Sequence, residues 1–273
     1  MRDTISSFRG AGVGPRARNP YSRTVIMDSG LAALRRSGMT ALLVLVVVLA
    51  AGIAAALLAG HAVAQDRDRS MATVAEIPLT GDDGQQVANH AVKLLGPIDK
   101  LPGVVTVGNP DGKTTLVEFY DLNCPYCRIA SSDIADMVDL DRELKLVLVP
   151  FPVLGIPSIT ASRVELAVAK LATPQQFYDF HRKVYAQRGV TDGARALEIA
   201  RSLGLDTKAL TKLGDTDEIT ETMKAHVRLG NSLGLAATPA FVIDGVAILG
   251  YPGRYRLQAI VDASDACGKV VCD

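Results

Sequence analysis

The sequence lacks the short motifs of several large enzyme classes. Among its 273 residues there is no Gly-rich phosphate-binding loop, no GxSxG nucleophile elbow and no HExxH helix. Internal repeats and low-complexity tracts are also absent. His90, His181 and His226 have no metal-ligand spacing, and two of them lie on or beside apolar helical faces, so we predict that they are packed or capped side chains.

Net charge is absent as well, because 29 basic residues balance 29 acidic ones. Seven of the basic residues and only two of the acidic ones lie in the first 64 positions, so the rest of the chain has an excess of five acidic residues. A mildly acidic body has no electrostatic footprint for a polyanion. We therefore expect no nucleic-acid partner.

Charged side chains are missing from Ser37 to Gln65, and residues 41–60 are almost entirely apolar. This run is long enough to span a bilayer, and the arginines before it fit the positive-inside rule. A small-residue A-x-A cleavage site ends at Ala64. Residues 1–64 are thus predicted to be a signal peptide released near Ala64 or a membrane anchor. Both alternatives place the body in the periplasm or elsewhere outside the cytoplasm.

The next segment, residues 65–103, is polar and mixed. It contains one amphipathic stretch at about 85–95, which is closed by Gly96 and Pro97. The pattern is compatible with a linker, a packing helix or an oligomerisation helix. A homo-oligomer assembled through this segment is therefore one of the predicted states.

Cysteine is scarce, and two of the four cysteines, Cys124 and Cys127, stand two residues apart between a strand-like run at 115–120 and a helix-like segment at about 128–138. Backbone N–H groups and the helix dipole stabilise a thiolate at a helix start, which lowers the thiol pKa from about 8.5 to roughly 3.5–7.5. The second thiol, one turn on, can close a small disulfide ring. A CxxC pair in this position predicts a redox-active disulfide, with no other cofactor required.

The hydrophobic pattern predicts an α/β fold. Apolar runs bounded by turn residues predict strands, and amphipathic periodicity predicts four helices after the buried strand at 144–149. Asp244-Gly245 is a two-residue hairpin turn. A final amphipathic segment predicts a terminal helix. The predicted strands are 104–107, 114–120, 144–149, 240–243 and 246–249. The order is a strand, a βαβ unit, a helical insert and a ββα unit.

This order resembles a thioredoxin-like fold with a helical insertion between its βαβ and ββα halves, the plan of the DsbA-like family of exported thiol–disulfide oxidoreductases. Residues 119–127 resemble the family's active-site approach and redox pair, Glu118 matches its buried strand acid, and Thr238-Pro239 resembles its cis-proline loop. The resemblance covers 104–266, with the insert at about 155–235.

The resemblance implies roles for the residues of the redox pair. Cys124 would be the nucleophile, exposed at the helix start, and Cys127 the more buried resolving thiol with the higher pKa. Pro125 and Tyr126 would set the helix start and the electrostatics around Cys124, and would contact the substrate. The redox pair itself would be the reactive group.

Two further residues receive roles from the resemblance. Glu118 would act as a proton relay for Cys127, the alternative being an edge or surface glutamate. Pro239, if cis, would present the backbone of Thr238 to an extended substrate peptide, the alternative being an ordinary trans turn proline. Threonine before this proline resembles the isomerase and reductase branches, so the reaction direction stays open.

The remaining cysteines, Cys267 and Cys272, lie in a C-terminal tail at 267–273. In an exported chain a local structural disulfide is the default for such a pair. A second redox relay and a zinc site built from all four cysteines are the alternatives. We predict the structural disulfide and no metal.

The leading functional hypothesis is an extracytoplasmic enzyme that exchanges disulfides with exported proteins, as an oxidase or as an isomerase or reductase. A membrane redox partner would recycle it. The competing hypothesis is a thioredoxin-like chaperone or a copper-binding module that uses the same thiols without turnover.

Overall fold

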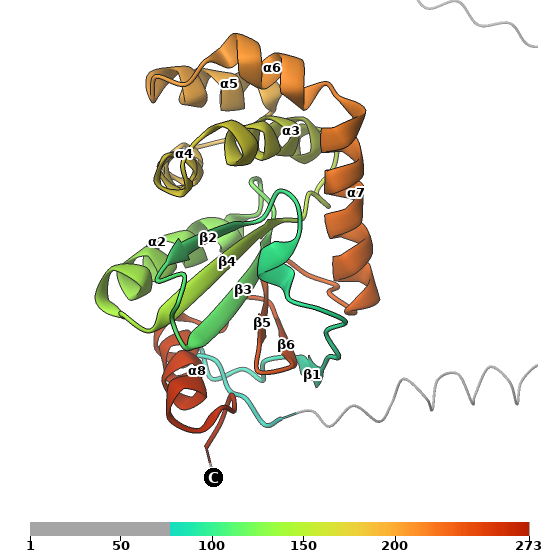
Figure 1. Cartoon of the computed structure of the whole chain (residues 1–273). Coiled ribbons are helices and arrows are strands. Elements are labelled where there is room, and N and C mark those ends of the chain that lie inside the picture. The colour runs from blue at the N-terminus through green and yellow to red at the C-terminus, as the bar shows by residue number, and fades with distance from the viewer. Residues whose placement is uncertain (1–76, 273) are drawn as a thin grey trace, which may run out of the picture. The chain divides into compact units, whose positions relative to one another are not determined.

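The described part of the chain is built on one six-stranded mixed sheet (Figure 1). The computed structural model describes residues 77–272, so the predicted signal or anchor segment lies outside the described residues. The strand order is β1-β6-β5-β3-β4-β2; β3 and β4 are parallel and all other neighbours are antiparallel. The strands are β1 Asn89–Ala91, β2 Val105–Gly108, β3 Thr114–Tyr120, β4 Leu144–Pro150, β5 Ala240–Ile243 and β6 Val246–Leu249. The five predicted strands are confirmed to within one residue at each end.

Five of the helices, α3 to α7, are inserted between β4 and β5, and the others, η1, α2 and α8, lie outside this insert in the sequence. In Figure 1, α3 to α6 gather beyond one end of the sheet and α7 leads back toward it. The helices are η1 Ile98–Lys100, α2 Pro125–Leu140, α3 Ile156–Leu171, α4 Pro174–Ala186, α5 Gly193–Ser202, α6 Thr207–Gly214, α7 Asp217–Ser232 and α8 Arg254–Cys267. Within residues 77–272, none of these helices has the length and apolar character needed to cross a membrane.

Both faces of the sheet are buried, and the alternation along β3 shows how. Leu116 and Tyr120 point into the larger core cluster, which also contains side chains from α2, α3, α4 and α8. Val117 and Phe119 point into a second cluster on the opposite face, together with Ile98 of η1. Since Glu118 lies between Leu116 and Tyr120 at period two, its side chain shares the face of the larger cluster.

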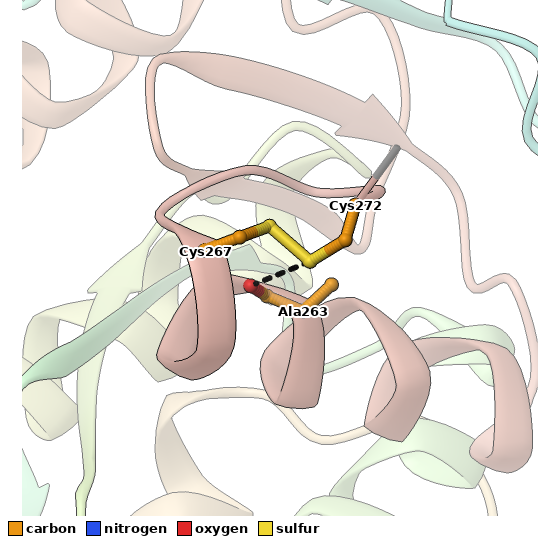
Figure 2. The surroundings of a disulfide bond; sticks show 3 residues. All are labelled: Ala263, Cys267 and Cys272. Atoms are coloured by element: carbon orange, nitrogen blue, oxygen red, sulfur yellow. Dashed lines mark hydrogen bonds between the residues drawn. A yellow bond between two sulfur atoms is a disulfide. The ribbon is translucent and has the colours of Figure 1, made fainter.

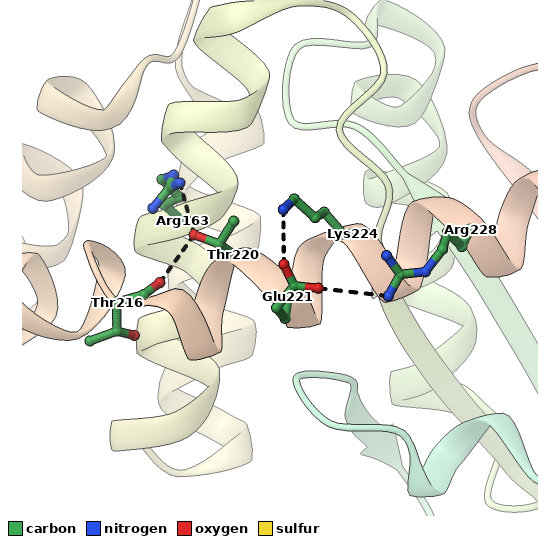
Figure 3. Close-up of polar contacts among 6 residues, drawn as sticks. All are labelled: Arg163, Thr216, Thr220, Glu221, Lys224 and Arg228. Atoms are coloured by element: carbon green, nitrogen blue, oxygen red, sulfur yellow. Dashed lines mark hydrogen bonds and ion pairs between the residues drawn. The ribbon is translucent and has the colours of Figure 1, made fainter.

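The insert is tied together by polar contacts between α3 and α7, shown in Figure 3. The Arg163 guanidinium on α3 donates a hydrogen bond of 2.9 Å to Thr220 Oγ1 on α7. Glu221 on the same helix pairs with Lys224 at 2.8 Å and lies 4.0 Å from Arg228. These last three side chains are exposed, so their ion pairs contribute little to stability compared with the buried faces of the helices.

The candidate oligomerisation helix at 85–95 is not formed. Asn89–Ala91 instead adds an edge strand, β1, to β6, with Asn89 opposite Ile248. The Asn89 side chain accepts a hydrogen bond from Ile77 N at 2.8 Å and donates one to Ile77 O at 2.7 Å. A partner strand 155 to 159 positions away in the chain thus outweighs a weak local helical pattern.

Candidate active site

Cys124 is the N-cap residue of α2, directly after the loop that leaves β3. Its Sγ accepts a hydrogen bond of 3.4 Å from the backbone N–H of Cys127, and Pro125 occupies the first turn, where no N–H is needed. The helix therefore begins at Pro125, three residues before the predicted start. This arrangement places both thiols within the first turn, facing the same core.

The two thiols differ sharply in acidity. The pKa of Cys124 is lowered to about 6, first by a hydrogen bond from the Cys127 side chain, then by one from the Thr238 side chain and by the N–H groups of Cys127 and Tyr126, while burial opposes the shift. Burial raises the pKa of Cys127, and its hydrogen bond to Cys124 adds to this. The sequence pointed to the helix start as the source of acidity, whereas the neighbouring thiol is the larger cause.

The expected exposure of Cys124 is wrong, because only 3% of the residue is accessible. The carbonyl oxygen of Thr238 lies 3.1 Å from its Sγ, a contact in which the protonated thiol donates. Exposed surface at this point comes from Pro125 and from Tyr126, which is 62% accessible. Thr238 reaches the sulfur because the cis peptide Thr238–Pro239 directly precedes β5, which pairs with β3.

Glu118 lies in the middle of β3, between Leu148 of β4 and Phe241 of β5. Only 1% of the residue is accessible, so the alternative of an edge or surface glutamate is wrong. Its Oε1 has no hydrogen-bond partner. Burial raises the pKa of Glu118 to about 8, and the charges of Cys124 and Glu165 add to this rise. A carboxyl group in this state can take up and release a proton near neutral pH.

A polar cluster beside the thiols had no role assigned from the sequence. The buried Asp121 carboxylate accepts four hydrogen bonds of 2.6 to 2.9 Å, from Asn123 N, Val153 N, Leu154 N and Ser158 Oγ. Asn123 continues the cluster, because its Oδ1 accepts a hydrogen bond of 2.7 Å from Thr191 N. These contacts fix the loop before Cys124 against the insert. The sequence offered one signal for this cluster: the polar residues Asp121 and Asn123 stand between an apolar strand and the CxxC motif.

A second buried cluster was also missed. The Tyr120 hydroxyl donates to Glu165 Oε1 at 2.9 Å, and His181 Nδ1 lies 3.3 Å from the same oxygen. The Tyr120 and His181 rings meet edge to face, with centroids 4.6 Å apart. Tyr185 links the two clusters, since its hydroxyl donates to the Asp121 carbonyl at 3.0 Å. The only sequence signal was an acidic residue within the apolar face of a helix.

The three histidines in the described residues are packed, as predicted. His90 Nε2 lies 2.8 Å from the Leu233 carbonyl, and the ring nitrogens of His226 face the carbonyls of Pro102 and Pro150 at 2.8 and 3.2 Å. His181 is buried beside Glu165, as described above. Within the described part of the chain, no three or more His, Cys, Asp or Glu side chains converge in a group able to hold a metal ion.

Cys267 and Cys272 form a disulfide with Cα atoms 6.1 Å apart (Figure 2). Cys267 is the last residue of α8, and Gly268 after it has the left-handed backbone conformation that turns the chain back, with φ 68°. Cys272 Sγ lies 3.5 Å from the Ala263 carbonyl oxygen. Because a disulfide sulfur carries no hydrogen, this is a packing contact. The bond closes the tail onto the end of α8, and Cys124 and Cys127 are the two free thiols of residues 77–272.

The family model for the DSBA-like thioredoxin domain matches residues 115–263 of this chain. Two curated relatives are similar. Disulfide bond formation protein D of Bacillus subtilis is 24% identical over 59% of this chain and 77% of its own length. The Na(+)/H(+) antiporter NhaA of Herminiimonas arsenicoxydans is 25% identical over 66% of this chain, which spans only 28% of the antiporter's length.

Several solved structures are also similar to this chain. A thioredoxin-like oxidoreductase from Silicibacter pomeroyi has a TM-score of 0.57 and 33% identity, over 63% of this chain and 99% of that one. The catalytic domain of Proteus mirabilis ScsC has a TM-score of 0.56 and 26% identity, over 61% of this chain and 92% of that one. The thiol-disulfide exchange protein alpha-DsbA2 from Wolbachia pipientis has a TM-score of 0.54 and 25% identity, over 58% and 85%.

Alkylation tests whether the hydrogen bond from Cys127 is the main cause of the lowered pKa of Cys124. In the reduced wild-type protein the rate of Cys124 alkylation should have its midpoint near pH 6, the pKa of this thiol. Cys127→Ala removes the donor and should move the midpoint upward, toward about 8.5. Cys127→Ser keeps a donor and should stay closer to the wild type. Equal midpoints in the alanine and serine variants, measured by mass spectrometry of the Cys124 peptide, would contradict this cause.

The buried acid should make stability depend on pH. Since the pKa of Glu118 rises from 4.5 to about 8 on folding, unfolding releases a proton between these values, and stability falls as pH rises through the interval. Glu118→Gln should therefore stabilise the reduced protein near pH 8 by a few kcal/mol relative to its effect near about pH 4. Urea unfolding at both pH values measures this. Glu198→Gln, at an exposed position of α5, is the control; parallel curves for Glu118→Gln and wild type would refute the assignment.

Proposed function

The chain belongs to the DSBA-like thioredoxin-domain family of protein thiol–disulfide oxidoreductases, and we propose that it exchanges disulfides with protein substrates through Cys124 and Cys127. One observation carries the proposal. A thiol with its pKa lowered to about 6 lies at a helix N-cap beside a second, buried thiol whose pKa is raised. This asymmetry separates an attacking thiolate from a resolving thiol at neutral pH.

The exchange balances within these residues. In the reducing direction the Cys124 thiolate attacks a substrate disulfide, forms a mixed disulfide and releases one substrate thiolate. Cys127 then gives its proton to the Glu118 carboxylate, and its sulfur attacks Cys124 Sγ. The second substrate thiolate leaves, and Cys124 and Cys127 are oxidised to a disulfide. The oxidising direction is the reverse of these steps.

Substrate contacts are proposed for the residues around the sulfur. The Thr238 carbonyl lies 3.1 Å from Cys124 Sγ, so an extended peptide whose sulfur reaches Cys124 passes this backbone acceptor. Thr238 and Pro239 supply one side of the approach, and the exposed Pro125 and Tyr126 supply the other. Backbone pairing and apolar contact of this kind suit protein substrates of varied sequence.

The lowered pKa of Cys124 raises the reduction potential of the thiol pair, but only by a small part of the range that separates reductants from oxidants. At pH 7, a pKa of about 6 in place of 9.0 stabilises the reduced form roughly tenfold, which equals about 30 mV for a two-electron couple. Reductants and oxidants of this chemistry differ by much more, from about −270 mV for thioredoxin to about −120 mV for DsbA. The remaining contributions to the potential, and the redox partner, therefore decide between an oxidase and an isomerase or reductase.

An extracytoplasmic location is part of the proposal. The apolar segment at 41–60 is its support from the sequence. The Cys267–Cys272 disulfide is a further support, because structural disulfides persist in oxidising compartments. One similar structure is a periplasmic thioredoxin-like protein from Salmonella enterica, with 26% identity and a TM-score of 0.54. The partners proposed for this chain are exported proteins with thiols or disulfides and a membrane redox protein that recycles the Cys124–Cys127 pair.

Catalysis by Cys124 is tested with the full chain and a reduced or scrambled disulfide protein. Wild type should accelerate recovery of the native disulfides, and Cys124→Ser should abolish the acceleration because serine is not a thiolate nucleophile. The matched control replaces both tail cysteines, Cys267→Ser and Cys272→Ser, and should keep full exchange chemistry. A wild-type protein that retains stoichiometric copper through purification and shows no turnover would identify a metal-binding module instead.

The pH dependence of the Cys124–Cys127 reduction potential should show the ionisation of Cys124. Below pH 6 two protons accompany the two electrons, and above the Cys124 pKa of about 6 only one does. The potential should therefore fall by about 59 mV per pH unit below this point and by about 30 mV per unit above it. Equilibration with glutathione or dithiothreitol at several pH values measures the slope. A constant steeper slope up to pH 8 would show that Cys124 is not acidified, and the value at pH 7 assigns the direction.

A further inference from the structure

We propose that the free edge of β2 and the groove beside it bind an extended segment of the protein substrate, at a site separate from Cys124. The proposal rests on the proposed function, because the occupant belongs to the polypeptide whose disulfide or thiol reacts at Cys124. It commits to one occupant: a segment in strand conformation that runs antiparallel to β2 and has a basic residue at its N-terminal end. Such a site favours substrates that still have unfolded segments.

β2 forms one edge of the sheet, so one side of its backbone faces no other strand among the described residues (Figure 1). Its register with β4 shows which groups lie on that side. Asn109 N donates to Leu144 O at 3.0 Å, which fixes the direction of the ladder. Because backbone groups alternate in direction along an antiparallel strand, the N–H groups of Thr106 and Gly108 and the Thr106 carbonyl point away from β4. These groups are available to pair with an added strand.

A groove of about 1250 Å³ lies beside this edge. Its walls are β2, the last residues of α2 and α3, the loop after α2 and the first half of α4. Val105, Val107 and Tyr178 line it and also belong to the larger core cluster, so the groove is on that face of the sheet. A strand added to β2 directs every second side chain to this face. The groove thus has room for the alternate side chains of the occupant.

One wall of the groove contains a buried polar group without a partner. Tyr178 is only 6% accessible, and its hydroxyl forms no hydrogen bond. Arg182, one turn later on α4, lies over the Tyr178 ring, with its guanidinium carbon 5.7 Å from the ring centroid. Buried polar groups are nearly always satisfied. An unsatisfied hydroxyl in the wall of an open groove indicates that an occupant completes this wall.

The sequence of β2 does not block strand addition. Edge strands are commonly protected by lysine, by proline or by a bulge. β2 has the sequence Val-Thr-Val-Gly, and its pairing with β4 is continuous over all four residues. None of these three protections is therefore present in this strand.

The charges at one end of the groove favour a basic residue in the occupant. Asp139 and Asp141 line the groove where α2 ends, and neither forms an ion pair with another residue of the described chain. Glu143 also lines this end and lies 3.8 Å from Lys113, while the exposed Arg142 is the basic side chain between these acids. The C-terminus of a helix adds partial negative charge. The carboxylates and the helix end thus attract a cation together.

The direction of the occupant follows from where this acidic end lies. Gly108, the last residue of β2, is opposite Lys145, so the loop after α2 is at the C-terminal end of β2. An antiparallel strand has its N-terminal residue at this end. The basic residue therefore belongs at the N-terminus of the bound segment.

The position of Cys124 sets the length of chain needed between the two sites. Cys124 precedes α2 and the acidic end of the groove follows it, so the 16 residues of this helix separate them by about 24 Å. An extended chain needs at least about seven residues to cover this distance. A flexible Gly/Ser linker matches it on average at about 19 residues. Binding at both sites makes the second contact intramolecular and strengthens the complex without changing the reaction at Cys124.

Two peptides test the proposal with the reduced full-length protein. Each begins with a cysteine in a disulfide with glutathione and ends with the segment Lys-Val-Thr-Val-Thr. The linker between them is about 19 Gly/Ser residues in one peptide and about four, which reach only about 14 Å, in the other. Single-turnover rates at increasing peptide concentration give the half-saturating concentration and the limiting rate. The long-linker peptide should half-saturate at a concentration about tenfold lower, with an equal limiting rate.

Variants of β2 and of the acidic end locate the effect. Thr106→Pro removes an N–H that points to the free edge and leaves the ladder with β4 intact, so the two peptides should become equal. Thr106→Val keeps this N–H and is the matched control, which should behave as the wild type. Asp139→Lys, at an exposed position, should weaken half-saturation by the long-linker peptide severalfold and favour a version with Glu in place of its Lys.

Equal half-saturating concentrations of the two peptides with the wild type would overturn the proposal, as would a linker effect that persists in folded Thr106→Pro. If Thr106→Pro does not fold, Asp139→Lys decides, and an unchanged preference between the Lys and Glu peptides counts against the groove. Sedimentation adds a further outcome. A wild-type dimer that Thr106→Pro converts to a monomer would identify a second copy of the chain as the occupant instead.

Failure of the proposed function has a different signature, because neither peptide would then undergo exchange. The groove is still tested in that case by the free segment Lys-Val-Thr-Val-Thr. Its addition should shift the amide NMR signals of Thr106 and Gly108 in the wild type. The absence of such shifts would refute binding at β2.

Discussion

The hydrogen bond from Cys127 to the sulfur of Cys124 is the interaction on which the site depends. It is the largest cause of the lowered pKa of Cys124, and it adds to the burial that raises the pKa of Cys127. It exists because Cys124 caps α2 while Cys127 occupies the first turn of the same helix. The cap is held in place by β3 on one side and by the Thr238 carbonyl on the other. Any change that moves the start of α2 would therefore alter acidity, accessibility and substrate contact together.

The environment of this pair is polar inside an apolar core. Glu118 and Glu165 each bury an oxygen without a partner, whereas the Asp121 carboxylate is saturated by four hydrogen bonds. The contrast separates two uses of a buried acid. A fully hydrogen-bonded carboxylate such as that of Asp121 fixes structure, because its oxygens hold several segments together. Glu118, whose pKa burial raises to about 8, can instead exchange a proton near neutral pH.

The helical insert is part of the site. Ser158 and Thr191 of the insert bind the loop before Cys124, through Asp121 and Asn123. Glu165 and His181 of the insert contact Tyr120 at the end of β3. The cost of burying these polar groups is met only when insert and sheet are packed together. The insert and the thioredoxin-like half should therefore respond to mutations in these contacts as one unit.

Local sequence patterns determined much of this protein. Alternating or continuous apolar runs specified the five strands, Asp244-Gly245 specified the hairpin, and the two cysteines before an amphipathic segment specified a redox pair at a helix start, because these signals act over a few neighbouring residues. The tertiary structure decided what depends on distant residues: the burial of Cys124 beneath Thr238, the pairing of Asn89–Ala91 with β6, and the hydrogen bond between Tyr120 and Glu165. Burial and charge coupling arise between groups tens to more than a hundred positions apart, so no local pattern carries them.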